Sequence, residues 1–299
     1  MEQLIIRKVD PILKKFFTNY DLRQCFTCGT CANGCPITGM PEMNNLNVLK
    51  ILRLLAYGLV EEVAASDFPW ICTGCGRCSY GCPMNIDIPA IMATLKKVNG
   101  HDQVPWSKNG NEDLSLSGSL PETNEEYLSY LKEFGLELAE AECPGFPMGT
   151  TTVYNHLIKL LQSGRVKINR SIHKDKLFTF HDACKHGRIL HRFLGKGYYE
   201  EPRWILKQCV DHYVEMEPNR ANSHCCGAGG AMWASKFEKE SAYLGQRKLE
   251  SIKNSKADVV VVTCSKCLYQ LKKRLPRHYD DCQFDVQTIW DVVQEAIRN

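Results

Sequence analysis

The chain has 299 residues, a formal net charge of +3 and an ordinary globular composition, but it contains 16 cysteines. So many cysteines indicate either a secreted disulfide scaffold or thiols that bind metal. The first residues, MEQLIIRKVDPILKKFF, lack the apolar core of a signal peptide, and no run of about 18 uninterrupted apolar residues is present. We therefore expect an intracellular protein with reduced, metal-bound thiols and no membrane span of its own.

The basic residues do not indicate a nucleic-acid-binding protein. They are scattered along the sequence, and neither a recognition helix nor an aromatic RNA-binding platform accompanies them. Clusters ligated by thiolates are anionic, so part of the positive charge can serve to offset them.

An internal repeat dominates the first hundred residues. The segment CFTCGTCANGCP at 25–36 matches CTGCGRCSYGCP at 72–83 in its cysteine spacing, in the glycine before the fourth cysteine and in the proline after it. Between the two copies, NNLNVLKILRLLAYGLVEEVAAS has leucines at helical spacing, with Asn44 or Asn45 as the expected N-cap. Each cysteine run is therefore predicted to lie in a turn between helices.

Residues 101–141 are predicted to connect two domains. The segment is rich in serine, asparagine, glycine and acid, with nine acidic and two basic residues. An amphipathic helix over roughly 124–140 is expected to end it. The sequence thus predicts a first domain over 1–100, this acidic connector, and a second domain over 142–299.

The second domain is predicted to be an α/β layer with a mainly parallel sheet, because short apolar strands alternate with helical segments. The predicted strands are 176–180, 212–216 and 257–263, and the predicted helices are 151–164, 201–209 and 230–255. Cys184 and Cys264 come just after two of these strands, where open α/β sheets place their sites. Cys264 and Cys267 are also expected to begin a helix, whose N-terminal N–H groups stabilise thiolates.

The repeated pattern C-x2-C-x2-C-x3-C-P is a specific signal for cubane [4Fe–4S] clusters, each held by three cysteines of one run and the fourth cysteine of the other. It predicts two ligand sets: Cys25, Cys28, Cys31 and Cys82 for one cubane, and Cys72, Cys75, Cys78 and Cys35 for the other. The alternative is zinc, but structural zinc sites generally use paired C-x2-C knuckles without a trailing Cys-Pro. The sequence resembles bacterial-type dicluster ferredoxins. Its long helical insert resembles their α-helical variant, found in heterodisulfide reductase and in succinate dehydrogenase iron–sulfur subunits.

Five more cysteines form a second pattern near the C-terminus: Cys184, the adjacent Cys225 and Cys226, and the C-x2-C pair Cys264 and Cys267. Five thiolates exceed the four that a cubane needs, and glycines at 227, 229 and 230 let the backbone crowd against a ligand. The pattern resembles the cysteine-rich CCG domain of the heterodisulfide reductase family. That resemblance implies a non-cubane [4Fe–4S] cluster held by all five cysteines. Three cysteines remain, and Cys209 is expected to pack in a core and Cys282 to lie at the surface or at a sheet edge. For Cys143 we expect a remnant of an ancestral site, and the alternative is a position facing the cluster pocket.

The order of the two domains resembles the D-type subunit of heterodisulfide reductase. The phrase YVEMEPNRANSHCCGAGG resembles most the catalytic iron–sulfur subunit of sulfite-reduction-associated membrane complexes. The family's CCG domain is usually duplicated, but the first copy is degenerate in this chain: AECPGFPMG has Glu142 in place of one cysteine and Pro144 as an interruption. We therefore expect one non-cubane site, which puts a mechanism that needs two such sites in doubt.

Polar residues flank the five cysteines. His181 and His224 are candidate catalytic residues, because a histidine can deliver protons as a disulfide is reduced. The alternative, equally open for both histidines, is hydrogen bonding to cluster sulfurs, which tunes the reduction potential. We expect this second role for Asp182, Arg188 and Lys266.

The expected function is that of an oxidoreductase subunit. Electrons would pass through two cubanes to or from the non-cubane cluster, which reduces or oxidises a disulfide or thiol substrate, either a small molecule or a protein. The alternative is an electron-relay subunit that links a flavin dehydrogenase to a quinone or haem subunit. No flavin or nicotinamide site is evident, because GAGGAM is a weak match to a dinucleotide loop. The resemblance implies partner subunits, either a membrane cytochrome b-type subunit or a soluble flavoprotein. It also implies that this chain lies in the cytoplasm, peripheral at the inner face of the membrane through those partners.

Overall fold

The computed structural model describes residues 22–98, 149–164, 167–230 and 232–298. The chain divides into two compact units. The first comprises Met1–Gly110 with Gly229–Leu244, and the second comprises Asn111–Ala228 with Gly245–Asn299. The predicted connector, its helix at 124–140 and the degenerate segment with Cys143 lie outside the described residues and stay predictions.

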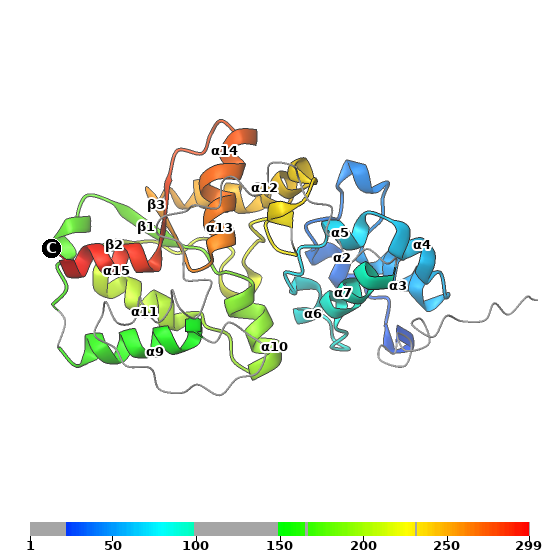
Figure 1. Cartoon of the computed structure of the whole chain (residues 1–299), viewed down its shortest axis with the longest axis horizontal. Helices are drawn as coiled ribbons and strands as arrows, with labels where there is room; N and C mark the ends of the chain where they lie inside the picture. The colour runs from blue at the N-terminus through cyan, green and yellow to red at the C-terminus, as the bar shows by residue number, and fades with distance from the viewer. Residues whose placement is uncertain (1–21, 99–148, 165–166, 231, 299) are drawn as a thin grey trace, which may run out of the picture. The chain divides into compact units, whose positions relative to one another are not determined.

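The first unit is helical (Figure 1). Its elements are η1 (Leu22–Gln24), α2 (Thr30–Gly34), η2 (Pro41–Met43), α3 (Val48–Ala56), α4 (Val60–Ala65), α5 (Phe68–Ile71), α6 (Arg77–Tyr80), α7 (Ile88–Val98) and η6 (Met232–Ala234). It also contains the first residues of α12 (Glu238–Ser255). Ile51, Leu55 and Leu95 lie at the centre of one apolar core, which α3, α4 and α7 share.

The leucine-rich segment between the cysteine motifs forms two helices and not one. Gly58 separates α3 from α4 in a left-handed conformation with φ of 83°, which ends the first helix. The N-cap of α3 is Asn47, whose side chain accepts a hydrogen bond from the backbone N–H of Lys50 at 3.0 Å. The expected N-caps Asn44 and Asn45 are wrong, because both adopt left-handed conformations before the helix begins.

The second unit is an α/β layer. Its helical elements are α9 (Gly149–Gln162), η3 (Arg170–His173), the π-helical turn η4 (Lys185–Ile189), α10 (Leu190–Leu194), α11 (Glu200–Cys209), η5 (Arg220–Asn222), the remainder of α12, α13 (Ser265–Tyr269), the π-helical turn η7 (Gln270–Arg274), α14 (Leu275–His278) and α15 (Ile289–Arg298). Its strands are β1 (Leu177–Phe180), β2 (His212–Tyr213), β3 (Val259–Val262) and β4 (Asp285–Thr288). All pairings are parallel, in the order β2-β1-β3-β4, which confirms the predicted fold class.

Helices cover both faces of this sheet. Phe178 and Phe180 of β1 pack against α9, α11 and α15 in one apolar core, and Figure 1 shows α13 and α14 on the opposite side of the strands. All four valines of β3 are buried, because a parallel strand between two helical layers has no face toward water. Cys209 is fully buried in the same core, which confirms its expected packing role.

Several element boundaries differ from the predictions. α9 ends at Gln162 ahead of the left-handed Gly164, as expected. α12 begins at Glu238 and not near residue 230, and its acidic first turn favours this start. The predicted strand 212–216 contains only two strand residues, and β4 and α15 were not predicted. Among the described helices, none has both the length and the hydrophobicity needed to cross a bilayer.

Candidate metal centres

The first cysteine motif surrounds the start of α2. Gly29, with φ of 81°, is the left-handed N-cap of this helix, and Cys31 lies within it. Burial raises the pKa of the Cys31 thiol, and the thiols of Cys25, Cys82 and Cys28 raise it further. These sulfurs therefore lie close enough to interact electrostatically, although Cys82 belongs to the second motif. The structure brings together the four cysteines predicted for one cluster.

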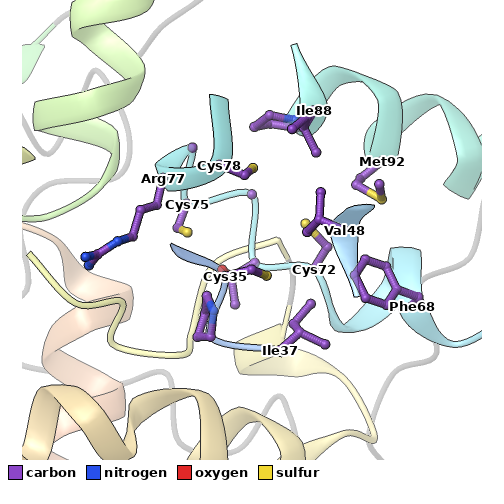
Figure 2. Close-up of a pocket in the computed structure, with 15 residues that line it drawn as sticks. Cys35, Ile37, Val48, Phe68, Cys72, Cys75, Arg77, Cys78, Ile88 and Met92 are labelled. Atoms are coloured by element: carbon purple, nitrogen blue, oxygen red, sulfur yellow. The ribbon is translucent and has the colours of Figure 1, made fainter. Parts of the chain in front are cut away.

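The second set of four cysteines lines one pocket: Cys35, Cys72, Cys75 and Cys78. Figure 2 shows their sulfur atoms facing a common space, with the apolar side chains of Val48, Phe68 and Met92 around it. Burial raises the pKa of both Cys35 and Cys78, and in each case the neighbouring thiols raise it further. Four thiolates in so confined a space repel one another unless a bound cation neutralises them.

The two motifs repeat in structure as they do in sequence. Gly76 caps α6 in a left-handed conformation with φ of 71°, as Gly29 caps α2. Cys35 follows α2, yet its side chain shares the pocket of Cys72 and its neighbours. Cys82 follows α6, yet its charge acts on the Cys31 thiol. Each motif therefore contributes its last cysteine to the group formed by the other.

The glycine run at residues 227–230 approaches the second motif through its last two members. A Cβ atom at Gly229 would lie 2.3 Å from the carbonyl oxygen of Thr73, and one at Gly230 would lie 2.3 Å from that of Cys72. Only glycine permits such backbone packing. Lys96 adds to this contact, because its Nζ donates to the carbonyl oxygens of Gly230 at 3.1 Å and of Cys72 at 3.5 Å. At these two glycines the close approach is to backbone, whereas the sequence suggested a bound ligand.

The third group of cysteines lies beyond the carboxyl ends of β1 and β3. Cys264 follows β3 and is the N-cap of α13, as predicted, and Cys267 lies within that helix. The Sγ atoms of Cys226 and Cys267 are 3.2 Å apart. Hydrogen bonds with Cys225 and with Cys267 lower the pKa of Cys226, and a hydrogen bond from Cys267 lowers that of Cys264. Four of the five predicted cysteines thus form a series of contacts from Cys225 through Cys226 and Cys267 to Cys264.

The fifth cysteine, Cys184, lies on the segment that leaves β1. It is half-buried and is the N-cap of the π-helical turn η4. Nδ1 of His186, in this turn, lies 2.8 Å from the hydroxyl oxygen of Thr263, the residue before Cys264, so the turn contacts the segment of the third group. A second π-helical turn, η7, directly follows α13. Such turns are rare and are frequent at functional sites, so their presence beside both cysteine-bearing segments supports a site here.

The two candidate histidines differ in their surroundings. His181 is 1% exposed, and one of its ring nitrogens and the sulfurs of Cys226 and Cys267 all lie within 4.8 Å of one another. Neither ring nitrogen of His181 has a hydrogen-bond partner among the described residues, and burial holds its pKa well below the usual value. His224 instead directs Nδ1 toward α12, where it lies 3.2 Å from the carbonyl oxygen of Arg247. The structure therefore places His181, and not Nδ1 of His224, at the sulfurs.

Two domain families match the chain. The family described as "4Fe-4S dicluster domain" matches residues 21–86, and the family described as "Cysteine-rich domain" (CCG) matches residues 178–272. The chain joins a 4Fe-4S dicluster domain to a CCG domain. The first carries the two repeated motifs, and the second carries all five cysteines of the third group. No solved structure matches the chain.

The relatives of the chain include components of heterodisulfide reductases. It is 29% identical over 107 residues to a C-type iron–sulfur subunit of CoB–CoM heterodisulfide reductase from Methanocaldococcus jannaschii, covering 35% of this chain and 55% of that protein. It is 27% identical over 154 residues to the D-type subunit of a dihydromethanophenazine:CoB–CoM heterodisulfide reductase from Methanosarcina barkeri. This match covers 50% of this chain and 34% of that protein. It is 22% identical over 345 residues to the B-type subunit of a CoM/CoB fumarate reductase from Methanothermobacter marburgensis, covering 86% and 68%. The chain thus spans about half of the first relative and a third of the second. The heterodisulfide reductase resemblance is confirmed, and the narrower one to sulfite-reduction-associated complexes stays a prediction.

A buried network of ion pairs and hydrogen bonds stabilises the CCG domain beside its cysteines. Arg203 of α11 donates to both carboxylate oxygens of Asp182 at 2.6 and 2.9 Å and to Glu215 at 2.8 Å. The backbone N–H of Arg220 donates to Asp182 at 2.7 Å. Burial raises the pKa of Glu215, but the hydrogen bonds from Arg203 outweigh it, so the pKa is lowered. Because Asp182 lies two residues before Cys184, the network fixes the loop that carries this cysteine.

Sequence reasoning missed two buried cations of the CCG domain, Arg203 and Lys248. No motif marks them, because their partners lie far away in the sequence. The only sequence signal was a charged residue inside an apolar helical stretch, such as Arg203 within EPRWILKQC. Charged residues are almost never fully buried unless a partner accounts for them, so burial in the structure identifies them where spacing could not.

The donor set of the CCG domain fits a metal–sulfur group. Cysteine sulfurs are soft ligands that suit iron–sulfur clusters and zinc. Thiolates this close together need a cation between them, and His181 offers a ring nitrogen at the same place that has no hydrogen-bond partner within the described part of the chain. Cys225, Cys226, Cys264 and Cys267 would hold such a group, with Cys184 as the predicted fifth ligand.

Proposed function

We propose that this chain is the iron–sulfur component of a heterodisulfide reductase-like oxidoreductase. In this proposal it passes electrons through two cubane [4Fe–4S] clusters to or from a non-cubane [4Fe–4S] cluster, where a disulfide is reduced or thiols are oxidised. The observation that carries the proposal is the third group of cysteines at the carboxyl ends of β1 and β3, with one cysteine more than a cubane requires. The cluster supplies one-electron steps beside the substrate sulfur, whereas disulfide cleavage needs two electrons.

The ligands in this proposal are the predicted ones. Cys25, Cys28, Cys31 and Cys82 hold one cubane, Cys72, Cys75, Cys78 and Cys35 hold the second, and Cys184, Cys225, Cys226, Cys264 and Cys267 hold the third cluster. The pKa effects among the first four cysteines and the pocket shared by the second four support the two cubane sets. The contacts within the third group support the non-cubane set.

His181 is the better candidate for moving a proton at this site. One of its ring nitrogens lies beside Cys226 and Cys267, where a substrate sulfur would have to arrive, and it has no hydrogen-bond partner among the described residues. His224 remains a candidate through its other ring nitrogen, since Nδ1 is occupied by α12. The buried surroundings of His181 exclude water from the proton it holds.

The test uses the variant Cys225→Ala in anaerobically purified protein, with Cys282→Ala as a control at a half-exposed cysteine outside the three groups. Disulfide reduction is measured with a reduced viologen as electron donor, and cubane integrity is measured by EPR. We expect Cys225→Ala to keep both cubane signals and lose disulfide turnover. Cys282→Ala should keep the two cubane signals and also the disulfide turnover. Unchanged disulfide turnover in Cys225→Ala would contradict the proposal.

A second candidate function is electron relay without substrate chemistry, from a flavin dehydrogenase to a quinone or haem subunit. The similarity to a fumarate reductase component over 86% of this chain favours it. A relay through the cubanes predicts that wild-type protein reduces no disulfide and that Cys225→Ala still carries electrons from donor to acceptor. The same pair of proteins therefore separates the two functions.

We propose partner subunits, either a membrane cytochrome b-type subunit or a soluble flavoprotein, because the relatives are named as subunits of reductases. The complex would lie in the cytoplasm, with this chain peripheral at the inner face of the membrane through its partner. Purification of the tagged chain from its own cells, with and without detergent, tests this: a co-purifying b-type cytochrome or flavoprotein is expected. Recovery of the chain alone under both conditions would contradict it.

A further inference from the structure

A fully buried lysine, Lys248, lies beside the cysteines of the CCG domain. It occupies α12 and has 0% exposed surface. Its Nζ donates to the hydroxyl oxygen of Ser223 at 2.9 Å and to the sulfur of Met216 at 3.2 Å, and both partners are themselves buried. Both acceptors are neutral, and a thioether is a weak acceptor. The ammonium group is therefore buried without the anion that would normally balance it.

The carboxylate of Asp182 acts on Lys248 through its charge but does not pair with it. Among the described residues, no carboxylate forms an ion pair with Lys248, and the oxygens of Asp182 are occupied by Arg203 and by the N–H of Arg220. Removing an unpaired ammonium from water costs several kcal/mol. A fold that accepts this cost has a negative charge at the same place in its working state. The cysteines are the groups that can provide it.

Packing places Lys248 beside the cysteines. Its partner Ser223 lies two residues before Cys225, and Gly245, which precedes Lys248 on α12, packs so closely on Cys226 that a Cβ added there would lie 2.6 Å from the carbonyl oxygen of Cys226. Burial lowers the pKa of Lys248 to about 8, while negative charge at Asp182, Cys226 and Cys267 raises it. The charge of Lys248 in turn helps to lower the pKa of His181, which lies against the same two sulfurs. Of the three N–H groups of the ammonium, two are used by Ser223 and Met216.

We propose that Lys248 is a positioning residue whose buried positive charge offsets the negative charge at Cys226 and Cys267 and raises the reduction potential of the iron–sulfur group these cysteines hold. Reduction adds one electron, and a fixed cation nearby stabilises the reduced form more than the oxidised form. Lys248 does not touch substrate in this account. The inference rests on the proposed iron–sulfur site, and it adds the group that sets the potential of that site.

The structure also offers a purely structural role for Lys248. Ser223 lies two residues before Cys225, and its carbonyl oxygen accepts from Nη1 of Arg188 at 2.9 Å. Lys248 could therefore serve only to hold this segment through the Ser223 hydroxyl. The two roles differ in their consequence: a structural tie does not require a charge, whereas control of the potential does.

The experiment is an EPR-monitored redox titration of holo-protein carrying Lys248→Met, Lys248→Arg or Lys253→Met. Lys253 is the matched control, because it lies on the same helix but is exposed and paired with Asp281. We expect Lys248→Met to shift the midpoint potential of the third cluster to a more negative value and to leave both cubane potentials unchanged. Lys248→Arg keeps the charge and should retain a potential near that of wild type. Lys253→Met should match wild type.

Each outcome decides the inference. An unchanged third potential in Lys248→Met, or an equal shift of all three potentials, overturns it. Lys248→Met could lose the EPR signal of the third cluster while both cubane signals remain. In that case, the presence of the third signal in Lys248→Arg supports a requirement for charge. Its absence in Lys248→Arg overturns the inference. The failure of the proposed iron–sulfur site is a separate result, because wild-type protein would then show no third cluster. The failure of the disulfide chemistry alone would appear as absent turnover and would leave the three potentials measurable.

Discussion

The dicluster domain and the CCG domain gather their cysteines in different ways. In the dicluster domain, three of the four cysteines in each group come from one repeated motif, around the turn at Gly29 or Gly76 and the short helix that follows it. Only Cys35 and Cys82 join the group of the other motif. In the CCG domain, the cysteines come from segments about 40 residues apart, and the parallel pairing of β1 with β3 brings two of these segments together. Local turn geometry therefore builds the first two sites, and tertiary structure builds the third.

The difference has a consequence for mutation. A substitution within a motif of the dicluster domain should remove one site and leave the rest of the fold intact. The third site should also respond to substitutions at residues that never touch it, because distant residues such as Arg203 hold its loops in place.

The largest expected effect comes from removing the crossing cysteines. Cys35→Ser should lose the same cubane as Cys75→Ser, and Cys82→Ser should lose the same cubane as Cys28→Ser, because each pair belongs to one proposed ligand set. Each variant should lose about four irons per chain. Iron analysis and EPR of the four variants measure this. A spectrum of Cys35→Ser that matches Cys28→Ser and not Cys75→Ser would contradict the crossed arrangement.

The next effect tests the dependence of the third site on distant residues. Arg203→Met leaves Asp182 buried without its partner, so we expect the free energy of unfolding to fall by about 3–5 kcal/mol. Arg170→Met is the control, because its pair with Asp211 is exposed and should contribute less than about 1 kcal/mol. Urea unfolding followed by circular dichroism measures both. Equal small losses in the two variants would show that the buried network does not hold the CCG domain together.

A smaller effect is expected at the glycine that touches the second motif. Gly230→Ala places a Cβ against the carbonyl oxygen of Cys72, and overpacking of this kind costs about 1–3 kcal/mol. Gly58→Ala is the matched control, since Gly58 is also left-handed but a Cβ added there would meet no atom within 4 Å. We expect Gly230→Ala to be the less stable in urea and to alter the EPR spectrum of the cubane at Cys72. If Gly58→Ala destabilises the protein as much as Gly230→Ala, backbone conformation alone accounts for the effect.

The smallest effect concerns the helix cap. Asn47→Ala removes the hydrogen bond to Lys50 and should lower the free energy of unfolding by about 1 kcal/mol. Asn47→Ser keeps an oxygen that can accept this bond and should restore most of the loss. Thermal unfolding of the two variants checks the assignment, and equal melting temperatures would argue against Asn47 as the cap.

The sequence predicted most of what depends on short spacing. The two motifs, the helix start at Cys264 and the buried strand of β3 all follow from residues within a few positions of each other, and the structure contains them. The end of α9 before Gly164 follows in the same way, because a left-handed glycine is a local stop signal.

The positions of the buried charges depend on tertiary contacts, and the sequence did not predict them. The burial of Lys248 and the pairing of Arg203 with Asp182 arise only when the sheet and its helices assemble. The start of α12 was predicted too early for a related reason, because Gly230 packs against Cys72 with φ of 60°, which is outside the right-handed helical region. The helical spacing of the apolar residues carries no information about that contact.

The most direct measurement is the metal content of anaerobically purified full-length protein, with iron, acid-labile sulfide and zinc determined on a sample whose EPR spectrum is recorded. Three four-iron clusters predict about 12 irons per chain and an EPR signal distinct from those of the two cubanes. About eight irons with two cubane signals and no third signal, or zinc in place of iron, would contradict the three-cluster account.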